Sequence, residues 1–177
     1  KAATKLRQRN LIIPLTIEAV SSRRTQGATL QAVLIIQNKP PPSAECGKKS
    51  LKMKGYRSKM NGSQCNDVLI GSPMDDVLKG REGHDRLQGS SGNDTMHGGI
   101  GNDTLIGNTG DDKITASKGD DLVKGQRGND MLHGGRNHDK LLSGSGQDAI
   151  HGGRGNDVLY GGDGDDTLRG GRGNDIL

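Results

Sequence analysis

Residues 152–177 read GGRGNDVLY, GGDGDDTLR and GGRGNDIL, which are two complete copies of a nine-residue unit and eight residues of a third. The same frame runs back without insertion to residue 62, giving thirteen tandem copies. Position four is glycine in ten copies and position one is glycine in eleven. Self-similarity at a short fixed period is typical of solenoid proteins, in which each repeat stacks on its neighbours. The repeat therefore decides the fold of residues 62–177.

Two further positions of the unit are constant in character. Position eight is aliphatic or methionine in all thirteen copies, from Leu69 to Leu177. Position six is aspartate in all thirteen copies: Asp67, Asp76, Asp85, Asp94, Asp103, Asp112, Asp121, Asp130, Asp139, Asp148, Asp157, Asp166 and Asp175. The unit thus combines one inward apolar side chain with one carboxylate.

The glycines and the aspartate together indicate a calcium site. Glycine permits left-handed backbone angles, so we expect the first six residues of each copy to form a tight turn with inward-pointing carbonyls. Calcium takes about six to eight oxygen ligands from carboxylates and carbonyls, whereas zinc or copper would favour histidine or cysteine. The last three residues of a copy, such as 158–160, predict a short strand whose middle side chain faces inward.

The pattern G-x-x-G-[N/D]-D-x-U-x, where U is aliphatic, resembles the RTX (repeats-in-toxin) calcium-binding nonapeptide. The resemblance implies an all-β fold for residues 62–177, a right-handed parallel β-roll in which two copies make one coil. It also implies that each Ca²⁺ lies between turn n and turn n+2, so that thirteen turns hold at most about eleven ions. We expect metal binding and folding to be one event, because the chain has no Phe or Trp and only two Tyr for a core.

The resemblance implies that the metal ligands come from the thirteen aspartates and from the turns that precede them. Copies one and two carry Cys65 and Met74 at position four, so these turns should hold calcium poorly. Asn137 tolerates the left-handed region at the same position of copy nine. Ala116 and Ser143 at position one should lower the affinity for calcium but still allow the turn to form. The expected turn glycines are Gly92, Gly101, Gly110, Gly119, Gly128, Gly146, Gly155, Gly164 and Gly173, and the expected position-five ligands are Asp75, Asn93, Asn102, Asp111, Asp120, Asn129, Asn156 and Asp165.

Residues 1–61 differ from the repeats in charge. They hold 13 Lys/Arg and 2 acidic residues, a net charge of +11, whereas residues 62–177 hold 12 Lys/Arg and 19 acidic residues, a net charge of −7. Stretches 15–20 and 28–37 predict strands that would form a hairpin capping the roll, and 47–61 reads as a Lys-rich connector. The segment is either a cap, linker or solvated tail, or a surface for a polyanion such as an acidic polysaccharide. Tyr56 is the only aromatic residue of this segment, which argues against nucleic acid. No apolar run is long enough to span a membrane.

The most favoured function is a calcium-responsive module of a larger exoprotein or adhesin, and the resemblance implies an extracellular location. A rival is a structural subunit of a larger assembly, which uses the open C-terminal end and the basic segment as contact surfaces. A third alternative, ice binding, rests on a resemblance to calcium-roll antifreeze modules, which place threonine at position three, where only Thr109 matches here. The chain has no H-E-x-x-H or G-x-S-x-G motif, so we predict that it is not an enzyme.

Three smaller features leave alternatives open. His133 and His151 occupy position nine one coil apart, so they should stack, either as a transition-metal pair or as tolerated exposed residues. Cys46 and Cys65 form one disulfide in an oxidising compartment or remain two free thiols. The sequence begins at Lys1, which suggests a processed product or a fragment.

Overall fold

The computed structural model describes residues 34–36, 49–52 and 58–177, and these residues form parallel strands and no helix. The described part of the chain therefore contains nothing that could cross a membrane as a helix. The strands are β1 Leu34–Ile36, β2 Lys49–Lys52, β3 Ser58–Asn61, β4 Asp67–Ile70, β5 Val77–Glu82, β6 Arg86–Ser91, β7 Thr95–Ile100, β8 Thr104–Thr109, β9 Lys113–Lys118, β10 Leu122–Arg127, β11 Met131–Arg136, β12 Lys140–Ser145, β13 Ala149–Arg154, β14 Val158–Asp163 and β15 Thr167–Arg172.

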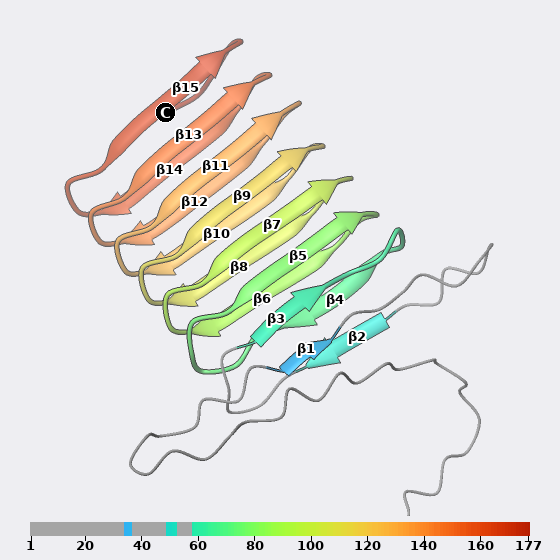
Figure 1. Cartoon of the computed structure of the whole chain (residues 1–177). Helices are drawn as coiled ribbons and strands as arrows, with labels where there is room; N and C mark the ends of the chain where they lie inside the picture. The colour runs from blue at the N-terminus through green and yellow to red at the C-terminus, as the bar shows by residue number, and fades with distance from the viewer. Residues whose placement is uncertain (1–33, 37–48, 53–57) are drawn as a thin grey trace, which may run out of the picture.

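Successive strands alternate between two sheets. The odd-numbered strands form an eight-stranded sheet and the even-numbered strands form a seven-stranded sheet, each in sequence order. Leu78 pairs with Met96 and Val123 pairs with Leu141, so neighbouring strands of a sheet are two copies apart. Two copies therefore make one coil of a parallel β-roll, as the sequence predicted, and Figure 1 shows the coils stacked along one axis.

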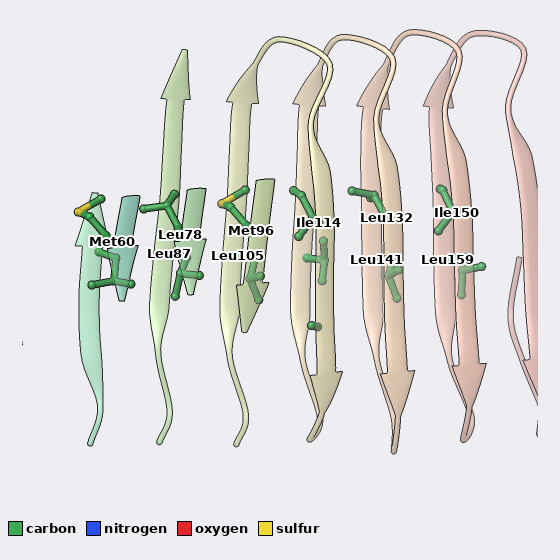
Figure 2. Close-up of a cluster of buried hydrophobic side chains, with 13 residues drawn as sticks. Met60, Leu78, Leu87, Met96, Leu105, Ile114, Leu132, Leu141, Ile150 and Leu159 are labelled. Atoms are coloured by element: carbon green, nitrogen blue, oxygen red, sulfur yellow. The ribbon is translucent and has the colours of Figure 1, made fainter. Parts of the chain in front are cut away.

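The core is a double row of position-eight side chains between the two sheets. Figure 2 shows these side chains pointing from both sheets into the space between them. They are almost fully buried from Leu69 to Leu159. Met60, which precedes the first copy by two residues, belongs to the same core. At the far end Leu168 is only partly buried and Leu177 is 62% exposed.

The strands are longer than the sequence indicated. Most strands hold six residues, such as Thr95–Ile100, which are positions seven to nine of one copy and one to three of the next. The expectation that the first six residues of a copy form the turn was therefore wrong, because only positions four to six turn. The buried and half-buried residues alternate along the first four positions of these strands, so position one faces inward. Glycine occupies this position in most copies, and the two exceptions, Ala116 and Ser143, are fully buried.

Three strands lie in the segment before residue 62. Strand β1 falls within the predicted strand 28–37, while the other predicted strand, 15–20, lies outside the described residues, so the hairpin stays a prediction. Strand β1 pairs in parallel with β3, and β2 pairs in parallel with β4. Strands β2 and β3 lie in the stretch that sequence alone suggested to be a connector. Both sheets therefore continue toward the N-terminus beyond the first recognisable copy.

Candidate calcium sites

The turns at the two edges of the roll depend on left-handed residues at position four. Gly92 has a φ of 98° and Gly146 a φ of 141°, and the other position-four glycines lie between these values. Asn137 takes the same region with a φ of 81°, as expected for asparagine. A side chain on Gly110 would collide with the carbonyl oxygen of Gly92 in the preceding coil. Position four thus needs glycine for both its dihedral angles and its surroundings.

The position-six aspartates form a buried ladder along each edge. Eleven of the thirteen, Asp67 to Asp157, are no more than 3% exposed. The backbone amide of Asp94 donates to Oδ1 of Asp112 at 2.8 Å, and the amide of Asp112 donates to Oδ1 of Asp130 at 2.9 Å. An equivalent bond joins each aspartate from Asp67 to Asp157 to the aspartate 18 residues later, so that the eleven carboxylates from Asp85 to Asp175 each accept one. Each of these eleven carboxylates is thereby fixed at one oxygen.

The second carboxylate oxygen of most of these aspartates has no hydrogen-bond partner although it is buried. A Cβ atom on the position-one glycine of the same copy would collide with it, as at Gly107 beside Asp112, so the missing side chain makes room for the oxygen. A buried charge without a partner is costly, and such groups in proteins are normally paired or bound to metal. The unpartnered Oδ2 atoms are those of Asp85, Asp94, Asp103, Asp112, Asp121, Asp130, Asp139, Asp148 and Asp157.

Eight of the buried carboxyl groups have raised pKa values, those of Asp85, Asp94, Asp103, Asp112, Asp121, Asp130, Asp139 and Asp157. Desolvation is the main cause, and it is opposed by the backbone hydrogen bond that each group accepts. Burial raises the pKa of Asp94 and that of Asp139 to about 8, and it raises the pKa of Asp103 and that of Asp130 to about 7. The site therefore disfavours free carboxylates at neutral pH unless a cation accompanies them.

The turns can supply oxygen ligands for such a cation. The hydrogen bonds between stacked turns use the amide of position four and the carbonyl of position three, as from Gly101 to Lys118 and from Gly110 to Arg127. The carbonyls of positions four and five take no part in these bonds. In the described residues, no three His, Cys, Asp or Glu side chains gather around one point. Any ion must therefore take most of its ligands from backbone carbonyls and one or two from carboxylates, a donor set that fits calcium.

Position-five residues lie on the exposed outer side of the turns and make a second ladder. The amide of Asn129 donates to Oδ1 of Asp111, and the amide of Asp111 donates to Oδ1 of Asn93. His84 and His138, which sequence reasoning left without a role, substitute in this ladder by accepting through Nδ1. Both histidines stand at position five of their copies, where the other copies mostly have Asn or Asp, and this shared position could have identified the role from the sequence. Whether the position-five side chains also bind metal stays a prediction.

Copies one and two differ from the rest. Ser63 and Ser72, at position two, donate from both amide and hydroxyl to the carboxylates of Asp67 and Asp76. Their hydroxyls also accept from the amides of Cys65 and Met74, which lack the left-handed conformation of glycine. Serine hydroxyls thus partly replace a cation in these two turns, which supports the expectation of weak binding. Cys65 is disulfide-bonded, and the only other cysteine, Cys46, lies outside the described residues.

The paired histidines lie on the outer face of the eight-stranded sheet. His133 and His151 are in register on β11 and β13, and their ring centroids are 4.9 Å apart with a tilt of 54°. The two side chains are therefore neighbours on one face, as expected, with their rings tilted rather than parallel. Burial lowers the pKa of His133, and the neighbouring His151 adds to this effect.

Comparison with known families agrees with this geometry. The family model of the RTX calcium-binding nonapeptide repeat, in four copies, matches three consecutive stretches of the chain, residues 70–105, 106–141 and 142–177. No curated protein matches the chain. The protein is a parallel β-roll with a calcium-type turn ladder, and it belongs to the RTX calcium-binding nonapeptide repeat family. Its repeats form a structural calcium-binding element.

Proposed function

We propose that the chain is a calcium-responsive folding module of a larger secreted protein, such as an exoprotein or adhesin. The observation that carries this proposal is the row of buried, unpartnered Oδ2 atoms on the position-six aspartates. In calcium-poor surroundings these carboxylates oppose folding, because each is desolvated without a counter-charge. In external calcium the same oxygens become ligands, and the free energy of binding becomes free energy of folding.

The ions would lie between turns of successive coils at both edges, held by position-six carboxylates and by turn carbonyls. Thirteen turns give at most about eleven such positions. Copies one and two are the weakest of these because their aspartates already accept serine hydrogen bonds. The chain's own residues have no further chemical step to perform, so we propose no catalytic activity for it.

The experiment is a calcium titration of the full chain, followed by far-ultraviolet circular dichroism and calorimetry on the same samples. The expected result is a coil spectrum in chelator, a β spectrum in millimolar calcium, and a stoichiometry of several ions. Magnesium is the matched control, because it demands octahedral geometry and releases its water reluctantly. A β spectrum of equal amplitude in chelator and in calcium would refute the coupling of binding to folding.

A further inference from the structure

The basic residues of the roll are segregated on one of its two faces. Eight of the twelve Lys and Arg residues of 62–177 lie on strands of the eight-stranded sheet, where the only acidic residue of the described strands is Glu82. The seven-stranded sheet carries the other four. The basic eight are Lys79, Arg81, Lys113, Lys118, Arg136, Arg154, Arg169 and Arg172. A roll with net negative charge thus has one basic face, because its acidic residues concentrate in the turns.

Strand register lines up these side chains in columns along the roll axis. Lys118, Arg136, Arg154 and Arg172 pair in sequence across β9, β11, β13 and β15. Across the same strands runs a second column of Thr115, His133, His151 and Arg169. Neighbouring members of a column are separated by one strand spacing, about 4.8 Å.

A groove lies between the two columns. Its floor is Ser117, Gly135, Gly153 and Gly171, and its volume is about 660 Å³. The floor residues have positive φ, and a side chain on Gly153 would collide with the carbonyl of Gly135. The floor therefore stays free of bulky side chains, so that a ligand can approach the backbone closely.

The arginine column has an energetic cost that nothing in the described structure offsets. Like charges directly opposite each other on adjacent strands destabilise a sheet. Within the residues that the structure describes, neither Arg136, Arg154 nor Arg172 forms an ion pair, and all three are exposed. A linear ligand with regularly spaced anionic groups would neutralise the column along its length.

We propose that this groove binds an extended acidic polysaccharide, with carboxylate or sulfate groups against the arginine column and hydroxyls against the imidazole and threonine column. Single-stranded nucleic acid is disfavoured because no Phe, Tyr or Trp lines the groove for bases to stack on, and its two histidine rings lie against each other. Duplex DNA is disfavoured because its grooves admit a helix or ribbon rather than a flat sheet face. The proposal rests only on the folded roll, and it concerns a different surface from the basic segment 1–61.

The test compares two triple variants of the full chain in saturating calcium. One replaces the arginine column, Arg136→Gln, Arg154→Gln and Arg172→Gln. The matched control makes the same charge change on the opposite sheet, Arg86→Gln, Lys124→Gln and Arg127→Gln. Binding of fluorescent dextran sulfate and of chondroitin sulfate is measured over a range of salt, with neutral dextran as the blank. Residues 1–61 are the same in all proteins, so their contribution cancels in the comparison.

We expect the column variant to bind at least about tenfold more weakly than the parent, with a smaller dependence on salt, because fewer counterions are released. The control variant should lose less than about twofold. Equal losses of affinity in the two variants would contradict the location of the binding site in the groove. A short oligonucleotide that displaces the polysaccharide at lower concentration would contradict the choice of an acidic polysaccharide as the ligand. Circular dichroism of each variant with and without calcium shows whether the roll is folded, which keeps this result separate from the calcium proposal.

Discussion

The amide of Asp94 donates a 2.8 Å hydrogen bond to Oδ1 of Asp112, one full coil further along the chain, while Oδ2 of Asp112 is buried without a partner. One carboxylate therefore has two separate tasks. Its first oxygen fixes the stacking of two turns, and its second oxygen is available to a cation. The two tasks can be separated by mutation.

The variant Asp112→Asn keeps an oxygen that accepts from the Asp94 amide but removes the charge. We expect its calcium stoichiometry to fall by at least one and its folding midpoint to move to higher calcium. The variant Asp112→Ala also removes the acceptor, which should cost about 1–3 kcal/mol more in the free energy of unfolding. Calcium titrations and urea unfolding in saturating calcium measure the two effects, and identical stabilities of the two variants would contradict the ladder role.

The pKa values predict the pH dependence of the calcium-free roll. The folded-state pKa of Asp94 and that of Asp139 are raised to about 8, above the unfolded value, so their protonated forms stabilise the fold. This contribution is fully present below the unfolded pKa and is lost as the pH rises through the folded pKa. The free energy of unfolding in chelator should therefore decrease as the pH rises from about 6.5 to about 9.

Because we expect a coil in chelator alone, the measurement is thermal unfolding in chelator with an osmolyte that restores the β spectrum. The window starts at about pH 6.5 because burial lowers the pKa of His97 and that of His133 in the folded chain. These two histidines therefore reduce the stability of the fold only below about pH 6.5, where they bind protons more readily in the unfolded chain. In saturating calcium the decline should vanish, since the ion favours the carboxylate form. A stability that rises with pH in chelator would rule out the carboxyl groups as the opposing charges.

Position four should tolerate asparagine better than alanine. Gly110 has a φ of 123°, where an alanine side chain is strained, and such strain costs about 1–3 kcal/mol. Both variants add a Cβ atom that meets the carbonyl oxygen of Gly92, but asparagine tolerates the left-handed region, as Asn137 does in copy nine, so Gly110→Asn should lose less stability than Gly110→Ala. Urea midpoints in saturating calcium rank the two variants, and a reversed order would show that Gly110 matters for a reason other than its dihedral angles.

The edge ladder at position five predicts that His138 is a structural residue. Its Nδ1 accepts from the amide of Asn156 at 2.9 Å, and its own amide donates to Oδ1 of Asp120. His138→Ala should lower the free energy of unfolding by about 0.5–1 kcal/mol, whereas His138→Asn should restore the acceptor. Equal stabilities for His138→Ala and the parent would show that solvent replaces this bond without cost.

Much of the fold could be predicted because the repeat is nearly free of exceptions. Position eight identified the core from Leu69 to Leu159, and the glycines identified the turns. Strand length was not predictable, because positions one to three read as turn residues, and their strand conformation comes from pairing with the neighbouring coil. Strands β2 and β3 were missed because the residues before 62 lack the position-six aspartate of the repeat, so their strand conformation becomes evident only from their pairing with β4 and β5. Met60, nine residues before Leu69, was the available signal.

The sequence by itself determined the period, and with it the identity of the buried apolar side chain and of the buried carboxylate. The aspartate alone could not reveal which of its oxygens is used for stacking, since that depends on an amide 18 residues earlier. Only the tertiary structure placed Lys118, Arg136, Arg154 and Arg172 in one column, because charges that are dispersed along the chain become adjacent when each coil returns to the same strand register.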